Sequence, residues 1–231
     1  RFTGDGWSFK SMHRELVLSA TYAQASGNAA ATASDPDNRW YSQYPLRRLE
    51  AEELRDALLA AGDQLDREFG GSMLKVKNRG YLFDHTSIDK TDYTSRRRSL
   101  YLPVIRNNVY DVFQLLDFPD PAISSGDRAS TVVAPQALLM MNSDLVMQSA
   151  SDLAARLASS TTDDAARLRR LYVIAFARVP TASEVDESLQ FLARAESQLT
   201  SQDPDPAARR RTAWELLCHA TLAANEFLYL P

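Results

Sequence analysis

The residues most suited to acid–base chemistry lie in one loop. Asp117, Asp120 and Asp127 fall within eleven positions of one another, and Arg128 follows directly. Crowded carboxylates raise one another's pKa, so that one of them can hold a proton at neutral pH. A hydrolase or a carbohydrate-active enzyme could use this Asp117–Arg128 loop, and its further basic groups would be Arg97 and Arg98. Aspartates in loops and beside prolines are also common turn residues, and the turn interpretation is favoured.

A second group of charged residues has helical spacing. Arg48, Glu52, Arg55 and Asp56 stand at positions i, i+4, i+7 and i+8, so that opposite charges stack one turn apart on a helix. This stripe is either a solvated face or a network buried against another element. In a buried network every charge must be paired, because stranding one costs about 3–5 kcal/mol.

A third group consists of aromatic residues that could stack on sugar rings. Trp7, Trp40, Tyr41 and Tyr44 all lie near the N-terminus of the sequence. Together they could form a platform for direct carbohydrate binding. Large aromatic side chains contribute most when they are buried, so we expect most of the four to be buried, which would exclude the platform.

The sequence contains no recognisable metal or haem motif. His13, His85 and His219 lie far apart and form no helical pair with the spacing of a zinc site. Cys218 and His219 match the tail of a haem attachment signal, but Glu215 stands where that signal needs a second cysteine. Cys218 is therefore expected to pack as a small hydrophobic residue.

Nucleophile and phosphate-binding motifs are also missing. There is no Gly-x-Ser-x-Gly elbow and no glycine-rich phosphate loop. The acidic run Asp35-Pro36-Asp37-Asn38 lacks the length and ligand alternation of a calcium loop and predicts a turn. We therefore assign no catalytic residue, no metal and no cofactor to this chain.

Composition argues against nucleic acid and membranes as partners. The net charge is −4, and 30 acidic residues face 26 basic ones. The short arginine runs have no array of stacking aromatic residues beside them. No stretch approaches the roughly 20 apolar residues of a membrane span, so no membrane insertion is expected. With 231 residues, the chain is long enough for one large domain or two small ones.

Apolar residues recur mostly at helical spacing, which predicts a mainly α-helical, multi-helix globular domain. The expected helices cover residues 7–26, 46–66, 109–116, 136–141, 143–157, 163–178 and 181–199, and a last one begins near 207 and includes Leu228 in its apolar stripe. The last three should form a C-terminal antiparallel bundle. Thr181 and Glu184 have the spacing of a capping box, and Asn142 or Ser143 should cap the helix that follows them.

Two apolar runs, residues 73–77 and 99–105, predict one short two-stranded β patch. The whole chain, residues 1–231, is expected to form a single domain. The alternative is a subdivision into residues 1–132, with helices and an irregular insert, and residues 133–231, with the helical bundle.

Several short strings carry a family resemblance through their ordered combination. They are Trp7-Ser8-Phe9-Lys10, Asp35-Pro36-Asp37-Asn38-Arg39, Arg47-Arg48-Leu49-Glu50-Ala51-Glu52, Arg97-Arg98-Ser99-Leu100-Tyr101, Phe118-Pro119-Asp120-Pro121, Thr131-Val132-Val133-Ala134-Pro135-Gln136, Met141-Asn142, Arg178-Val179-Pro180-Thr181 and Asn225-Glu226-Phe227-Leu228-Tyr229. With these strings the chain resembles the planctomycete C-terminal domain of unknown function, family fifteen fifty-three in the unknown-function series.

The resemblance implies a context more than a mechanism. Such domains typically end long exported proteins that carry a c-type cytochrome-like domain upstream, which implies the periplasm or the cell surface. Haem is therefore expected only in an upstream domain and not in this chain. The family has no established catalytic residues, so none is carried over.

We therefore expect a non-catalytic interaction or structural domain of a larger exported, haem-associated protein. It would dock another domain of the same polypeptide or an envelope protein, with polysaccharide as an alternative partner. The polar residues expected to form its interaction or structural network are Arg48, Glu52, Arg55, Asp56, Arg97, Arg98, Asp117, Asp120, Arg128, Gln136 and Asn142.

Overall fold

The computed structural model describes residues 1–71, 73, 93–106 and 108–230. The chain forms two compact units, residues 1–48 with 229–231 and residues 49–228, called here the N-terminal unit and the helical unit. Residues on both sides of the predicted subdivision at 132 and 133 belong to the helical unit. The fold is mainly helical with one small two-stranded antiparallel sheet, which confirms the predicted fold class.

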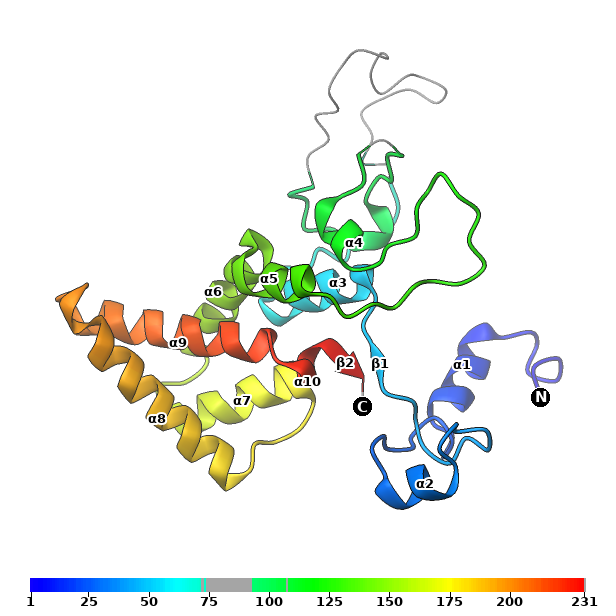
Figure 1. The fold of residues 1–231 in the computed structure, drawn as a ribbon, viewed down its shortest axis with the longest axis horizontal. Helices are drawn as coiled ribbons and strands as arrows, with labels where there is room; N and C mark the ends of the chain where they lie inside the picture. The colour runs from blue at the N-terminus through cyan, green and yellow to red at the C-terminus, as the bar shows by residue number, and fades with distance from the viewer. Residues whose placement is uncertain (72, 74–92, 107, 231) are drawn as a thin grey trace, which may run out of the picture. The chain divides into compact units, whose positions relative to one another are not determined.

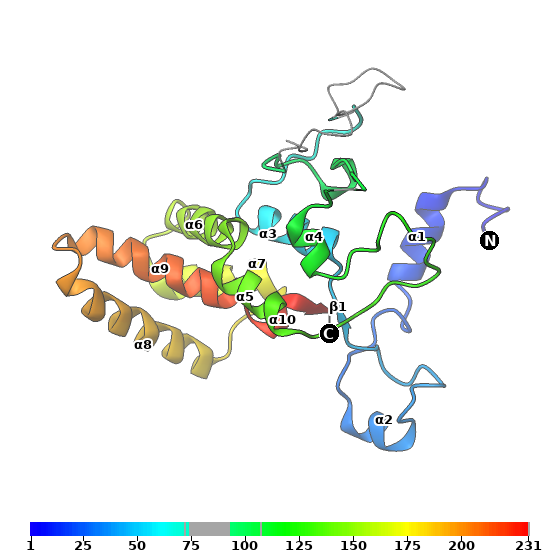
Figure 2. The same cartoon turned by 45° about the horizontal axis from the view of Figure 1, so that its top comes forward.

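The helical unit contains most of the helices (Figure 1). Its elements are α3 (Ala51–Ala61), η1 (Ser99–Tyr101), α4 (Asp111–Leu115), α5 (Ala134–Asn142), α6 (Asp144–Ala158), α7 (Asp164–Phe176), α8 (Ala182–Gln198), η2 (Leu199–Ser201), α9 (Pro206–Leu222) and α10 (Asn225–Leu228). Helix α9 packs against both α6 and α8, and Figure 2 shows α8 and α9 side by side. None of the described helices has the length and hydropathy needed to cross a membrane.

Side-chain caps set the beginnings of these helices. The Thr181 hydroxyl accepts the Glu184 amide at 3.3 Å, and the Glu184 carboxylate accepts the Thr181 amide at 2.7 Å, which confirms the predicted capping box. Ser143, one of the two residues proposed for the role, caps α6 through the Val146 amide. Because these caps satisfy orphan N–H groups, the helix starts are encoded locally.

The core of the helical unit is one cluster of buried residues that extends from α3, α4 and α5 through α6 to α7, α8 and α9. Helix α6 contributes Leu153 and Leu157, and α9 contributes Trp214 and Cys218, all with at most 4% of their surface exposed. Full burial of a large aliphatic side chain stabilises a fold by about 1.5–3 kcal/mol. Cys218 is therefore a packing residue, as predicted, and burial raises the pKa of its thiol to about 12.

Helix α3 is fastened to α6. Arg156 of α6 donates to the carbonyls of Ala60 and Ala61, at 3.1 and 2.8 Å, and so caps the C-terminal end of α3. At Gly62 a Cβ atom would lie 2.8 Å from the Cβ of Asp152, so only glycine permits this close approach. The two helices therefore hold a fixed position relative to each other.

The N-terminal unit contains α1 (Phe9–Val17), α2 (Ala29–Ser34) and the strands β1 (Arg47–Arg48) and β2 (Tyr229–Leu230). In the sheet, Arg47 lies opposite Leu230 and Arg48 opposite Tyr229. The predicted helix 7–26 is too long, because the Ser19 hydroxyl bonds to the Leu16 carbonyl and accepts the Tyr22 amide, which replaces helical hydrogen bonds.

Two further predicted elements are wrong. The helix expected from residue 46 begins only at Ala51, since Arg47 and Arg48 pair with the C-terminal strand. The strand expected over residues 99–105 is absent, because Ser99 donates its amide and hydroxyl hydrogens to Asp56 and the chain forms the short helix η1. Of its expected partner, residues 73–77, only Met73 lies within the described residues.

The last predicted helix is divided. It ends at Leu222, and α10 begins three residues later at Asn225. The Thr221 hydroxyl bonds back to the Leu217 carbonyl at 2.8 Å, an interaction that weakens helix ends. The break lets Glu226 of α10 accept two hydrogen bonds from Arg178, at 2.5 and 2.8 Å.

Candidate functional site

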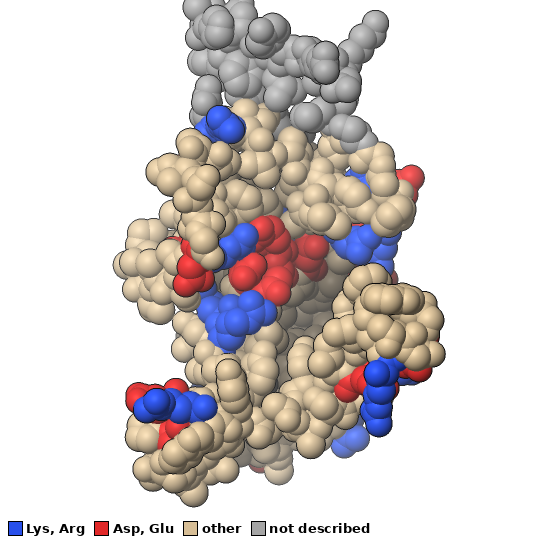
Figure 3. Space-filling view, turned by 90° about the vertical axis from the view of Figure 1, so that its right-hand side faces the viewer, with Lys and Arg blue, Asp and Glu red and all other residues tan. Residues whose placement is uncertain are grey.

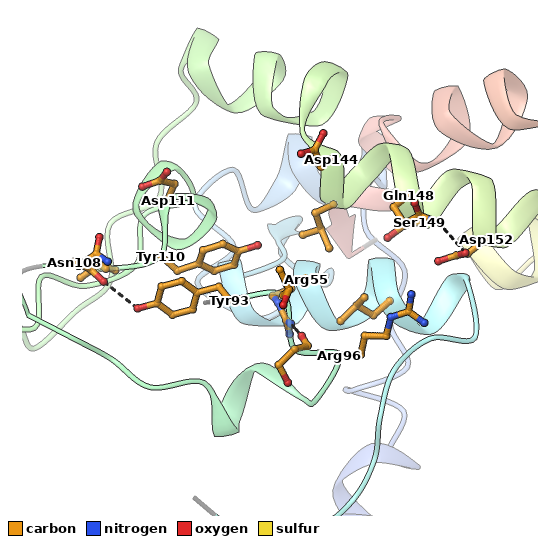
Figure 4. Close-up of a pocket in the computed structure, with 15 residues that line it drawn as sticks. Arg55, Tyr93, Arg96, Asn108, Tyr110, Asp111, Asp144, Gln148, Ser149 and Asp152 are labelled. Carbon is orange, nitrogen blue, oxygen red and sulfur yellow. Dashed lines mark hydrogen bonds between the residues drawn. The ribbon is translucent and has the colours of Figure 1, made fainter. Parts of the chain in front are cut away.

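A cleft of about 550 Å³ opens in the helical unit and is lined by four stretches of chain (Figure 4). Its lining residues come from α3, from the segment 93–96, from residues 108–111 and from one face of α6. Ligand sites in proteins typically have volumes of roughly 300–1,000 Å³. The cleft is therefore large enough to hold a small molecule.

One wall of the cleft is the polar face of α6. Asp144, Gln148 and Asp152 are spaced four residues apart and project from the same side of the helix (Figure 4). The Gln148 amide donates to the Asp152 carboxylate at 3.1 Å. The opposite side of α6 carries Leu153 and Leu157 into the core, so the helix cannot rotate without exposing them.

A second wall is aromatic. The rings of Tyr93 and Tyr110 stack with their centroids 4.7 Å apart at 17°, and Phe113 packs edge-on against Tyr110. The Tyr93 hydroxyl donates to the Asn108 carbonyl at 2.9 Å. Burial raises the pKa of the Tyr110 phenol. Tyr110 therefore stays neutral at physiological pH, as a hydroxyl that can donate and accept hydrogen bonds.

Arg55 lies at the base of the cleft and is only 2% exposed. Its guanidinium donates to the Arg97 carbonyl at 2.9 Å, to the Ser99 hydroxyl at 3.2 Å and to the Ser95 carbonyl. Asp56 lies 3.5 Å away, and burial lowers the pKa of the Arg55 guanidinium. The Nε atom of Arg55 has no hydrogen-bond partner among the described residues.

Together, Arg55 and Asp56 fasten the segment 95–99 to α3. Asp56 accepts the amide and hydroxyl hydrogens of Ser99 at 2.8 and 2.7 Å. Of the two interpretations of the charged stripe, burial is therefore correct at Arg55, whereas Asp56 is only partly buried. Arg48 does not share this helix, because it lies on β1.

Glu52 belongs to a different cluster. It accepts two hydrogen bonds from Arg128, at 2.7 and 3.1 Å, and Glu50 lies 3.0 Å from the same guanidinium. These carboxylates raise the pKa of Arg128, and the hydrogen bonds that Arg128 donates to Glu52 contribute most. A bidentate arginine–carboxylate pair fixes geometry as well as charge, so this pair holds the loop that contains Arg128 against α3.

The carboxylates of the Asp117–Arg128 loop serve the loop itself. Asp117 accepts the amide and hydroxyl hydrogens of Thr131 at 2.8 and 2.7 Å, and the Gln136 amide at 3.3 Å. Asp120 accepts the Ala122 amide two residues on. Asp127 accepts the Arg128 amide at 2.8 Å. The turn interpretation therefore fits Asp120 and Asp127, whereas Asp117 joins residues 14 and 19 positions away, and none of the three lines the cleft.

The remaining predicted residues also hold the backbone. Arg97 donates to the carbonyls of Glu68 and Gly70 and lies 4.3 Å from the centre of the Tyr101 ring. Arg98 lies 5.6 Å from the same ring. The Asn142 amide donates to the Leu138 carbonyl within its own helix. Arg97 and Arg98 are thus engaged apart from the Asp117–Arg128 loop, and the convergent pocket expected of a hydrolase is not formed by the described residues.

Only Arg55 of the predicted set lines the cleft. The sequence did not predict the other residues that line the cleft. Helix α6 nevertheless has a recognisable pattern, because Asp144, Gln148 and Asp152 form a polar stripe opposite its apolar face. No group of three or more metal-binding side chains occurs in the described parts of the chain. The face drawn in Figure 3 shows basic and acidic side chains next to each other, with no extended area of one charge.

The structure thus defines a mainly helical chain with one minimal sheet and a polar cleft among the described residues. The family model described as PSD1, Protein of unknown function (DUF1553), matches residues 1–192, and the chain belongs to this family. The predicted membership of family fifteen fifty-three is thereby confirmed, although the match ends within α8 and leaves out the closing string around Glu226. No curated protein and no solved structure matches the chain.

Proposed function

We propose that this chain is a non-catalytic docking domain of a larger exported, haem-associated protein. In this proposal the N-terminal unit binds a neighbouring domain of the same polypeptide, at the periplasmic or cell-surface location implied by the family resemblance. The haem belongs to that neighbouring part of the protein and not to this chain.

The observation that carries the proposal is the exposure of apolar side chains in the N-terminal unit. Trp40 is 78% exposed, Tyr41 71% and Trp7 66%. On α1, Phe9 and Leu16 are also more than half exposed. The expected burial of most of the aromatic residues is therefore wrong, and only Tyr44 of the four is partly buried. Exposed apolar side chains of this size mark interaction surfaces where they adjoin, and the ring of Phe2 packs against those of Trp7 and Phe9 at 5.3 and 5.2 Å.

The N-terminal unit has no apolar core to hold these residues. Among its described residues only Asp35 is buried. An apolar side chain that stays in water contributes nothing to folding, whereas burial of a tryptophan or tyrosine against a partner removes roughly 150–250 Å² from solvent. Docking is thus the event that would use these side chains.

The loop that presents Trp40 and Tyr41 has a fixed shape. The Asp35 carboxylate accepts the amides of Arg39 and Trp40, at 2.8 and 2.9 Å, and the Ser42 hydroxyl at 3.2 Å. Burial alone would raise the pKa of Asp35, but these hydrogen bonds outweigh it, and the pKa is lowered. A loop that is ordered before it binds loses less conformational entropy on docking.

Tryptophan fluorescence provides a direct test. The variant Trp214→Phe leaves only Trp7 and Trp40, both in the N-terminal unit. Adding the domain that precedes this chain in its parent protein should shift their emission to shorter wavelength. Calorimetry should then show binding that Trp40→Ala weakens at least tenfold, about 1.4 kcal/mol.

Phe69→Ala is the matched control, because Phe69 is an equally exposed aromatic residue of the helical unit, at 87%. It should leave the affinity unchanged. No emission shift and no heat of binding would refute the proposal. A shift produced by a soluble polysaccharide alone would instead assign the exposed rings to sugar binding and would equally contradict protein docking.

A further inference from the structure

The cleft of the helical unit offers hydrogen-bond donors and acceptors to the same small volume. Its acceptors include the carboxylates of Asp111 and Asp144, which have no side-chain hydrogen bond or ion pair within the described part of the chain. Its donors include Gln148 and Arg96, each of which has further N–H groups beyond its bond to Asp152 or Gln64. A hydroxyl group both donates and accepts, so a ligand rich in hydroxyls satisfies both kinds of partner at once.

Arg55 fixes the base of the cleft and carries an unusual buried donor. It is 2% exposed and lines the cleft, yet its Nε–H has no acceptor among the described residues. A buried donor without a partner is costly, and such groups in folded proteins are rare. The Nε atom is covered by protein atoms, so Arg55 shapes the base of the cleft, and a ligand would meet the exposed groups of the lining.

The charges of the lining favour a neutral ligand. The carboxylates of Asp111, Asp144 and Asp152 disfavour an anion, and the guanidinium groups of Arg55 and Arg96 disfavour a cation. A metal ion is also disfavoured, because no metal-binding group of three or more side chains occurs in the described segments. The balance leaves an uncharged, polar molecule.

The aromatic wall indicates that the ligand also has an apolar surface. Tyr93 and Tyr110 give the cleft an apolar surface beside its polar groups, and the volume is about 550 Å³. A sugar ring combines hydroxyl groups around its edge with C–H groups on its faces, which matches a polar lining with one aromatic side. We infer that this cleft binds a neutral sugar unit, at a site separate from the exposed aromatic residues of the N-terminal unit.

Saturation-transfer NMR tests this inference with D-glucose, D-galactose and N-acetyl-D-glucosamine at millimolar concentration. At least one of these sugars should receive magnetisation from the protein. Gln148→Ala and Asp144→Asn should each weaken that binding at least fivefold, because each removes a group that faces the cleft. Both residues are exposed on α6, so neither variant disturbs the core.

Gln190→Ala is the matched control. It makes the same change on an exposed position of α8, outside the cleft lining, and should leave the signal unchanged. Glucuronate and glucosamine are the charged probes, and both should bind more weakly than the neutral sugars. Absence of transfer to all three neutral sugars, equal binding by the cleft variants, or preference for a charged probe would each overturn the inference.

Discussion

Replacing Arg55 by leucine tests whether a buried cation organises the cleft. The side chain donates three hydrogen bonds, to Arg97, Ser99 and Ser95, and is 2% exposed. Hydrogen bonds from a charged donor contribute roughly 1.5–3 kcal/mol each, and the cost of burying the charge offsets about half of the total. We therefore expect Arg55→Leu to lower the free energy of unfolding by about 3 kcal/mol.

Lysine should not rescue this position. Its single ammonium group cannot reach the carbonyls of Ser95 and Arg97 with the planar geometry of a guanidinium. Arg55→Lys should therefore still cost about 2 kcal/mol. A loss of that size in a variant that keeps the positive charge would show that the planar geometry of the guanidinium stabilises the fold as well as its charge.

The assay is urea unfolding followed by Trp214 fluorescence, in a background of Trp7→Phe and Trp40→Phe. Trp214 is then the remaining tryptophan and lies in the helical unit, so the signal reports that unit. The slope with urea should stay unchanged while the midpoint falls. Hydrogen exchange of the Ser99 amide, which bonds to Asp56 at 2.8 Å, should become faster.

Arg170→Leu is the control, because Arg170 is exposed on α7 and such surface changes usually stay within about 0.5 kcal/mol. A loss below about 1 kcal/mol for Arg55→Leu would refute the reasoning. It would mean that the cost of burying the guanidinium equals what its hydrogen bonds return, and that the segment 95–99 is held by other contacts.

Three further outcomes follow from the ionisable groups. Arg178 lowers the pKa of Glu184 from 4.5 to about 2, so the ionised Glu184 stabilises the fold above pH 4.5 and stabilises it less as the pH falls. From about pH 6 to about pH 3, the free energy of unfolding of the wild type in urea should therefore fall more than that of Glu184→Gln. Equal losses would contradict this. Because burial raises the pKa of the Cys218 thiol to about 12, a thiol reagent should react only after unfolding, and rapid reaction with the folded protein would exclude the buried position. Asp35→Ala should speed hydrogen exchange at the amides of Arg39 and Trp40, whereas unchanged rates would show that the carboxylate does not hold the loop.

The parts of the fold that depend on neighbouring residues could be predicted from sequence. The capping box of Thr181 and Glu184 depends on residues three positions apart, and the burial of Cys218 follows from the apolar stripe of its own helix. The turn interpretation of Asp120 is similarly local, because its partner is the amide of Ala122. In each case the interaction partner lies within a few residues.

The parts that depend on distant pairs could not be predicted. Arg55 donates to the carbonyls of Arg97 and Ser95, which lie 42 and 40 residues away in the sequence, and no local pattern identifies these partners. The apolar run that begins at Ser99 has a strand-like composition, but the bonds to Asp56 decide its conformation. The pairing of Arg48 with Tyr229 joins residues 181 positions apart (229 − 48) and leaves no trace in either segment.

The same distinction explains why the cleft was missed. Its lining combines four stretches of sequence, and each stretch looks like ordinary polar surface when taken alone. Asp144, Gln148 and Asp152 resemble the solvent-facing side of any amphipathic helix. They become a candidate site only because α3, with its buried Arg55, lies next to them across the cleft.

The two proposed binding functions rest on different residues, and this makes them separable. The loop with Trp40 is held by Asp35 within the N-terminal unit, whereas the cleft is organised by Arg55 within the helical unit. Asp35→Ala should therefore weaken docking and leave sugar transfer unchanged, and Gln148→Ala should do the reverse. Measured on the same preparations by calorimetry and by saturation transfer, the effects of the two changes should add in the double variant, since sites without shared partners are usually independent. If either single change abolished both activities, assigning docking and sugar binding to separate sets of residues would be wrong.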